Sequence, residues 1–466
     1  MGRYFRLPAA LKAAAGRRSR GKPYGLLELG PVRSLLERLS QPAALALLTG
    51  VNLLVTFALQ WLPVARLGVG AATDALFVSA IVPQVILSVV SSGLTSVLTP
   101  LLATAGADRV RVHTWTYAQG VGLMAVALNG LLFLLAPWWV AWLVPGFDPA
   151  ARSLTVDLVR VQLTGAVATM LLMVAWSADY ARRRFVRVEA TAILAGLVGL
   201  GVAAALLPRL GVHAVAWGMS LRSILQLALL VPGWGRYARP DWRGAGGRTA
   251  FARLLPLMGG ATYFKLDPMV ERVLASFAPA GQLSLLHLGQ QAYAAGNQIL
   301  TKALVNPIMP ALAEMAATCV WPDFARLTWR RLAAVLVAAT AAWIGLALIG
   351  RPVLSIALGR WLGPAEIVLL HVILVALGGV WLGGAAGQVS TVSFFALGDT
   401  RTPTTVGVVG FTVAIPIKIV FYLWWGVVGL AVATSIYTAG NAVAHQILLH
   451  RAIGRRAALA EARLPA

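Results

Sequence analysis

The sequence predicts an all-α polytopic membrane protein with about 12 transmembrane helices, in two pseudo-symmetric six-helix lobes around a central cavity. Three observations predict this fold: the apolar composition, the alternation of basic and nearly uncharged loops, and a repeat between the two halves of the chain. Of the 466 residues, 59% are hydrophobic and 12% are charged, and the mean hydropathy is +0.78. Soluble domains contain about 25% charged residues. This composition therefore excludes a large soluble helical protein.

Apolar stretches long enough to cross a bilayer begin after residue 41. We predict spans at 42–62, 74–104, 115–144, 154–178, 188–207, 211–232, 254–276, 282–312, 332–350, 363–393, 405–423 and 427–449. The terminal segments and the loops after even-numbered spans hold 28 of the 39 Lys and Arg residues, whereas the opposite loops hold five. This positive-inside pattern predicts that both termini are cytoplasmic. The net charge of +23 thus reflects topology, with a secondary attraction to anionic lipid headgroups, and does not indicate nucleic-acid binding.

The two halves of the chain contain a weak repeat. GVHAVAWGMSL (211–221) aligns without gaps with GVVGLAVATSI (426–436) at an offset of 215 residues. This offset equals six predicted spans, which is typical of parallel repeats related by an axis along the membrane normal. The predicted organisation is a basic cytoplasmic segment (1–41), a first lobe (42–232), a basic cytoplasmic linker (233–253), a second lobe (254–450) and a cytoplasmic tail (451–466).

The second predicted span carries an unusual polar stripe. Asp74 stands at its start, Pro83 lies in its interior, and at 100° per residue Gln84, Ser88 and Thr95 share one face with the acid. Proline predicts a kink because it removes a backbone hydrogen bond. One interpretation is a cavity wall with Asp74 near the outer mouth, and the alternative is that these hydroxyls pack between helices.

The seventh predicted span contains four charges in YFKLDPMVERVL (263–274). Lys265 and Arg272 are seven residues apart and share one face, and Asp267 and Glu271 share another. Charged side chains at membrane depth cost several kcal/mol unless they are paired or hydrated, and Pro268 is expected to break the helix. The acidic pair is a candidate coupling-ion site for H⁺ or Na⁺. Internal ion pairs, for example of Glu271 with Arg272 or Lys418, are the alternative.

The eighth predicted span places Gln291, Gln298 and Lys302 on one polar face, next to the seventh. We interpret the two spans together as one wall of a polar transport pathway, although pairing within the lobe would explain part of the pattern. The six histidines are scattered without metal-ligand spacing, and Cys319 is the single cysteine, so we expect no metal site and no internal disulfide.

Several motifs indicate a family. They are TDALFV (73–78) followed by Pro83 and Gly93, SILQLALLVP (223–232), LASFAPAG (274–281), IMPALAE (308–314) and FFALGDTRTP (394–403). Together they resemble the MurJ/MviN lipid II flippase family of the multidrug/oligosaccharidyl-lipid/polysaccharide exporter superfamily. The resemblance covers about residues 42 to 450 and implies a multi-pass transporter of the bacterial cytoplasmic (inner) membrane.

The chain also departs from that family. The resemblance implies arginines that contact the diphosphate of the substrate, but their places hold Leu53, Leu59, Leu87 and approximately Gln291. We also expect the family's thirteenth and fourteenth helices to be missing after residue 450. Because Lys and Arg pair with phosphate oxygens, Lys265, Arg272 and Lys302 are candidates for the diphosphate-binding role.

The resemblance and the polar spans predict a flippase that moves an undecaprenyl-diphosphate-linked saccharide by alternating access. The cargo would be a lipid II-like cell-wall precursor or an exopolysaccharide or O-antigen repeat unit. The predicted cavity residues are Asp74, Gln84, Ser88, Lys265, Arg272, Gln291, Gln298 and Lys302. Arg182, Arg183 and Arg184 are weaker candidates for gathering lipid headgroups, and positive-inside charge also explains them.

Two other functions stay open: a cation-coupled exporter of small amphiphilic compounds from the same superfamily, and a non-transporting scaffold for cell-wall enzymes. An enzyme is not expected, because the outer loops are short and nearly uncharged. We predict no cofactor, with transport driven by Na⁺, H⁺ or the membrane potential. The expected partners are a polyprenyl-linked glycolipid, membrane lipids and enzymes of cell-wall or polysaccharide synthesis.

Overall fold

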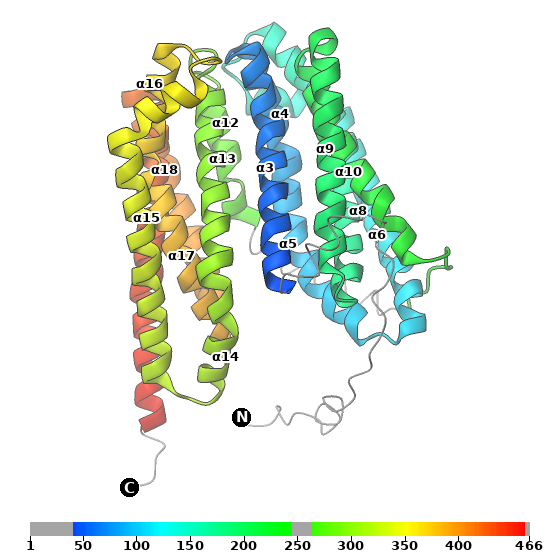
Figure 1. Ribbon diagram of the computed structural model, residues 1–466, viewed down its shortest axis with the longest axis vertical. Coiled ribbons are helices and arrows are strands. Elements are labelled where there is room, and N and C mark those ends of the chain that lie inside the picture. The colour runs from blue at the N-terminus through cyan, green and yellow to red at the C-terminus, as the bar shows by residue number, and fades with distance from the viewer. Residues whose placement is uncertain (1–40, 245–261, 462–466) are drawn as a thin grey trace. The chain divides into compact units, whose positions relative to one another are not determined.

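The computed structural model describes residues 41–244 and 262–461, and every regular element within these ranges is a helix (Figure 1). The first half contains α3 (Gln41–Leu67), α4 (Ala71–Ser79), α5 (Ile81–Thr104), α6 (Ala107–Leu134), α7 (Ala136–Leu143), α8 (Pro149–Ala181), α9 (Phe185–Leu210), α10 (Val212–Leu230) and the 3-10 turn η2 (Val231–Trp234). The second half contains α12 (Asp267–Ala275), α13 (Gln282–Leu300), the π-helical turn η3 (Thr301–Val305), the 3-10 turn η4 (Asn306–Ile308), α14 (Met309–Ala317), α15 (Trp321–Leu358), α16 (Pro364–Ala376), α17 (Gly378–Ala396) and α18 (Arg401–Glu461). The predicted N-terminal segment and part of the predicted linker lie outside the described residues.

Nine helices among the described residues are long and apolar enough to cross a membrane. They account for ten of the twelve predicted spans, because α18 joins the last two across a kink at Gly426. The predicted seventh span, 254–276, is described only from residue 262, and the eighth forms α13 but is too polar to be among the nine. The prediction of an all-α polytopic membrane protein is confirmed.

Large apolar side chains cover the outside of these helices. Ile356 is 84% exposed, and Leu348 and Trp138 are each 76% exposed. Exposed apolar surface on this scale would drive aggregation in water. It is the surface expected of helices that face lipid tails.

The predicted kink in the second span is present. The helix is interrupted by a turn at Ala80, three residues before Pro83. Pro83 explains the position of the break, because its ring clashes with the carbonyl four residues earlier, that of Ser79. The Ser79 hydroxyl donates to the Leu76 carbonyl (2.7 Å) and accepts from the Gln162 amide (2.6 Å), so side chains stabilise the broken turn.

The weak sequence repeat extends to the backbone. Gly211 has φ 54° and ψ −137°, and Gly426, 215 residues later, has φ 56° and ψ −135°. Residues with a side chain rarely adopt this conformation, because the Cβ atom clashes with the backbone. Each glycine therefore sets the start of the last span of its half.

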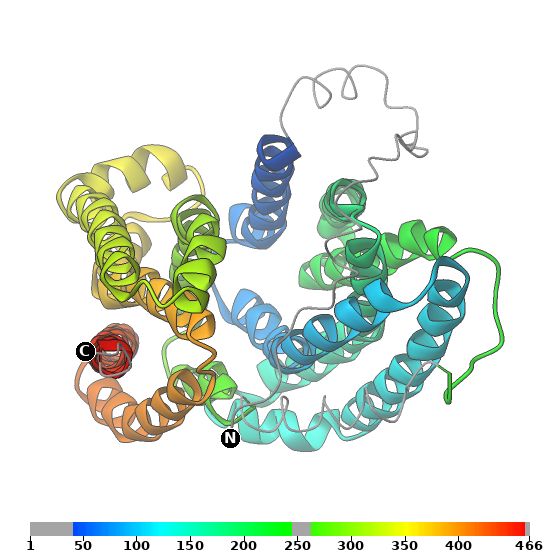
Figure 2. The same ribbon diagram turned by 90° about the horizontal axis from the view of Figure 1, so that it is seen from below.

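Helix α8 packs against α4, α5, α6 and α10 in the first half, and α9 packs along α10. In the second half α17 packs against α15 and α18. In the view from below, the colour runs from yellow in α15 through orange in α17 to red at the end of α18 (Figure 2). The largest apolar core combines residues from both halves, including Phe77 and Val78 of α4 with Leu285 and Leu286 of α13. The contact between α4 and α13 is therefore the place where the structure joins its two halves most closely.

Candidate functional site

Asp74 caps a helix of the opposite half of the chain. Its carboxylate accepts hydrogen bonds from the backbone N–H of Gly281 (2.6 Å), the N–H of Ser284 (2.7 Å) and the Ser284 hydroxyl (2.5 Å). The first turn of an α-helix has N–H groups without intrahelical partners and a partial positive charge. At the start of α13 the Asp74 carboxylate accepts hydrogen bonds from two such N–H groups, and its negative charge is attracted to the partial positive charge. Asp74, predicted to line a cavity, is 3% exposed and binds the two halves together.

Two glycines allow the backbones to approach closely at this junction, which we call the glycine seam (Gly146 and Gly281). Gly281 has φ +91°, and a Cβ there would lie 3.1–3.2 Å from the backbone of Val69 and Gly70. A Cβ on Gly146 would lie 2.5 Å from the carbonyl oxygen of Ser276, whose hydroxyl accepts from the Gly146 N–H (3.1 Å). Side chains at either position would force the two halves apart.

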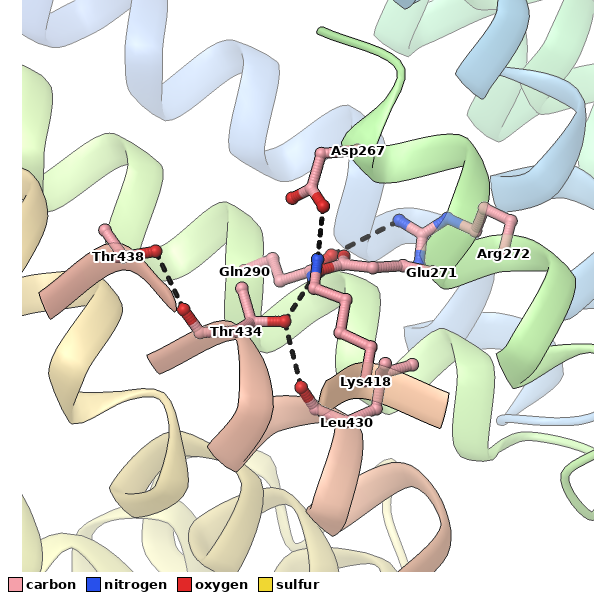
Figure 3. Close-up of polar contacts among 8 residues, drawn as sticks. All are labelled: Asp267, Glu271, Arg272, Gln290, Lys418, Leu430, Thr434 and Thr438. Carbon is pink, nitrogen blue, oxygen red and sulfur yellow. Dashed lines mark hydrogen bonds and ion pairs between the residues drawn. The ribbon is translucent and has the colours of Figure 1, made fainter. Parts of the chain in front are cut away.

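A buried charged cluster joins α12 to α18 (Figure 3). The Lys418 ammonium donates to Asp267 (2.5 Å) and to Glu271 (2.7 Å), and it is fully buried. Glu271 also accepts from the Thr434 hydroxyl (2.6 Å) and the Gln290 amide (2.6 Å). The three side chains that donate to Glu271 therefore come from two other helices, α13 and α18.

The position of Lys418 bears on the two hypotheses for the acidic pair. Asp267 and Glu271 lie one turn apart at the start of α12, where Pro268 occupies the first turn. The lysine ammonium occupies the place between them that a bound cation would need, and this geometry favours the internal ion pair. Within residues 41–244 and 262–461, no group of three His, Cys, Asp or Glu side chains is close enough to hold a metal ion.

Arg272 is buried between the halves rather than on an open cavity wall. It is 2% exposed, and its guanidinium contacts His287 Nδ1 (2.9 Å) and the side-chain oxygen Oε1 of Gln290 (3.4 Å). Because arginine stays protonated, the His287 Nδ1 must accept, which places the ring proton on Nε2. The His287 ring in turn stacks on Phe77 of α4, with ring centroids 4.4 Å apart.

The other predicted cavity residues are distributed along the helices. Lys265 donates to the backbone carbonyl of Ser88 on α5, which is a further contact between the halves. Lys302 is exposed and lies 15 residues beyond His287, or about 22 Å along the helix, so it is far from Arg272. The remaining predicted residues are exposed or half-buried: Gln84, Ser88, Gln291 and Gln298.

A groove of about 330 Å³ lies inside the first half, and we call it the first-half groove. Its polar lining consists of Asn52, Thr56, Gln60, Gln84, Gln162, Thr169, Trp176, Ser220, Arg222, Ser223 and Gln226, on α3, α5, α8 and α10. Arg222 donates to Thr56 (2.8 Å) and to Asn52 (2.9 Å), and Asn52 donates to Glu189 (3.2 Å). The groove therefore contains a fixed guanidinium whose counter-charge is one amide away.

Sequence reasoning did not find this groove. Arg222 is a lone cation within the predicted sixth span, and nothing in the local pattern identifies its partners on α3. Its occurrence in an apolar span was a signal, because buried charges in membranes are costly. Leu59 and Leu87, two of the positions where the family resemblance implies arginines, also line the groove.

The basic turn between α8 and α9 has structural contacts. Arg182 donates to the Gly233 carbonyl (2.5 Å), and Arg187 donates to the Leu229 carbonyl (3.0 Å) and pairs with Asp179 (3.5 Å). Arg187 thus satisfies a free carbonyl at the C-terminal end of α10, and Arg182 satisfies one in the η2 turn that follows. Arg183, at φ 58°, is exposed in the turn. Lipid-headgroup binding by this turn stays a prediction.

The family model for "Lipid II flippase MurJ" matches residues 64–464 of this chain. The chain belongs to the MurJ family. A probable lipid II flippase MurJ from Vibrio cholerae serotype O1 (strain ATCC 39315 / El Tor Inaba N16961) is 23% identical over an alignment of length 411 that covers 83% of this chain and 77% of the relative.

Solved structures share the fold. A lipid II flippase MurJ in an inward closed conformation matches with a TM-score of 0.77 and 16% identity, covering 89% of each chain. An inward-facing multidrug resistance MATE family transporter of the MOP superfamily matches at 0.67 and 14% identity, covering 88% of this chain and 95% of the other. The Vibrio cholerae MATE transporter VcmN in its bent form matches at 0.63 and 15% identity, over 91% and 98% of the two chains. The MurJ family fold is thus shared with multidrug transporters.

Proposed function

We propose that this MurJ family member is a flippase that carries an undecaprenyl-diphosphate-linked saccharide across the bacterial cytoplasmic membrane by alternating access. The observation that carries the proposal is the presence of cationic side chains in predicted membrane spans of a chain that matches the family from residue 64 to 464. Lys265 and Arg272 lie in the predicted seventh span, where a charge without function would cost several kcal/mol. Lipid II and an exopolysaccharide or O-antigen repeat unit both have the diphosphate that such charges would attract.

The contacts between the halves support alternating access. The Asp74 cap, the glycine seam and the Lys265 contact are hydrogen bonds and close backbone contacts, and such contacts can form and break as a unit. The charged cluster around Lys418 lies within the second half and would move with it as a rigid part. Both termini would face the cytoplasm, as the loop charges indicate.

A flipping assay in proteoliposomes tests the proposal. The purified chain would be reconstituted with a fluorescent undecaprenyl-diphosphate disaccharide in vesicles, and a membrane-impermeant reductant would be added. In protein-free vesicles about half of the label is accessible, and we expect nearly all of it to become accessible in vesicles that contain the protein.

A charge-neutralised variant provides the matched comparison. We expect the double variant Lys265→Gln, Arg272→Gln to insert normally but to leave the accessible fraction near that of protein-free vesicles. Equal label accessibility with and without the wild-type protein would contradict the flippase proposal, and full activity of the double variant would contradict the role of these two cations.

A further inference from the structure

The first-half groove is long and narrow, and it is separate from the charged cluster of the second half. On α8 its lining runs from Gln162 to Trp176, about 21 Å along the axis, and on α3 from Asn52 to Gln60, about 12 Å. Its volume of about 330 Å³ is at the lower end of the range for small-molecule sites. The groove therefore suits an extended, slender ligand.

The charges in the groove are balanced. The Arg222 guanidinium is held by Thr56 and Asn52, and Asn52 and Thr49 both donate to the Glu189 carboxylate. The Asn52 amide thus contacts both the positive charge of Arg222 and the negative charge of Glu189, and the two charges balance each other. Such a neutral arrangement is a poor site for a diphosphate.

Two polar atoms of the lining have no hydrogen-bond partner among the described residues. They are the side-chain oxygen of Gln60, which accepts only, and Nε1 of Trp176, which donates only. Buried polar atoms in native proteins nearly always have partners. A ligand that satisfied both atoms would have to offer donors and acceptors along its length, whereas the acceptor oxygens of an ionised phosphate could pair with the NH2 group of Gln60 but not with its oxygen.

Apolar side chains form the remaining walls. Leu59, Ile86, Met170 and Met219 line the groove between the amides and hydroxyls. Alternating polar and apolar contacts match a sugar ring, whose hydroxyl groups lie around its edge and whose C–H groups lie on its faces.

From these contacts we propose that the first-half groove binds an uncharged saccharide segment of one or two rings. The inference rests on the proposed function in one respect: the segment would be the sugar portion of the lipid-linked cargo. Gln60 would accept from a sugar hydroxyl or acetamido N–H, Trp176 would donate to a sugar oxygen, and Arg222 would donate to a hydroxyl near the middle of the groove.

Isothermal titration of the purified protein in lipid nanodiscs tests the inference, with the neutral disaccharide N,N′-diacetylchitobiose as the probe and inorganic pyrophosphate as the anionic comparison. We expect the disaccharide to bind, and Gln60→Leu and Trp176→Phe each to weaken binding by about fivefold, the effect of one neutral hydrogen bond. The matched controls Gln119→Leu and Trp138→Phe change exposed residues outside the groove and should bind like wild type. Unchanged elution in size exclusion would show that each variant is folded.

The inference is overturned if the disaccharide does not bind, if both groove variants bind it like wild type, or if pyrophosphate displaces it. The flipping assay separates this inference from the proposed function. Flipping by the wild-type protein without disaccharide binding would refute the saccharide groove alone. Disaccharide binding that the groove variants weaken, in a protein that flips no lipid-linked saccharide, would refute the flippase proposal alone.

Discussion

Replacing Lys418 by methionine tests the charged cluster most directly. The ammonium is fully buried between Asp267 and Glu271, at 2.5 and 2.7 Å, so its removal leaves two carboxylates facing each other. Removing one partner of a buried ion pair typically costs about 3–5 kcal/mol. Thr434 and Gln290 still donate to Glu271 in the variant, and Asp267 can take up a proton, so we expect a loss of about 3 kcal/mol, at the lower end of that range.

The assay is unfolding of the detergent-solubilised protein, followed by tryptophan fluorescence. Lys302→Met provides the matched control, because Lys302 is exposed and surface substitutions usually change stability by less than about 0.5 kcal/mol. The triple variant Asp267→Asn, Glu271→Gln, Lys418→Met should recover most of the lost stability, since it removes the whole charged group. We also expect Na⁺ to stabilise Lys418→Met but not the wild type, because a free cation can then occupy the place of the ammonium. A Lys418→Met variant as stable as the control would refute this account of the cluster.

Three further predictions follow from other contacts. Asp74→Ala should speed amide hydrogen exchange in the first turn of α13 by about 10- to 100-fold, because hydrogen bonds to a charged group contribute about 1.5–3 kcal/mol; unchanged exchange would show that Asp74 does not hold that turn. Cys319 is exposed in the turn between α14 and α15. It should resist a membrane-impermeant thiol reagent in intact cells and react after permeabilisation, and labelling in intact cells would contradict the predicted cytoplasmic position of this turn. Asp399 accepts from the N–H groups of Arg401 and Thr402 and from the Thr402 hydroxyl. Burial acts to raise the pKa of Asp399, but these hydrogen bonds outweigh it, and the pKa lies below its usual value. Because the folded pKa is the lower one, the stabilisation is present above the unfolded value and is lost as the pH falls through the folded value. Asp399→Ala should therefore cost about 1 kcal/mol at pH 7, and the difference from wild type in unfolding midpoint should vanish in acid.

The sequence predicted the helices well and their side-chain contacts less well. Composition, loop charge and Pro83 act locally, and so the fold class and the kink at Ala80 could be predicted. The face shared by Lys265 and Arg272 was inferred from an unbroken helix, but the turn at Leu266 interrupts it, and the two side chains contact α5 and α13 respectively.

The partners of buried charges depend on tertiary packing, which helical periodicity does not encode. Lys418 was named as one alternative partner of Glu271, and only the structure placed it against Asp267 as well. Arg222 lies within the predicted sixth span, yet its contacts come from residues more than 160 positions earlier in the chain. Sequence spacing cannot supply such a pairing.

The glycine seam has a consequence for the energetics of transport. At the seam two backbones meet with no side chain between them. A methyl group added there would clash in the conformation in which the backbones touch and would not clash in a conformation in which they are apart. Steric contact of an alanine side chain at Gly146 or Gly281 would destabilise the arrangement in which the seam is closed, and at Gly281 the positive φ would add backbone strain. A penalty of about 1.4 kcal/mol would change the ratio of the two arrangements tenfold. If the chain works by the proposed alternating access, the absence of two side chains would set how long it remains closed at this end, and the rate of the cycle would be adjustable there without any change in the residues that contact cargo.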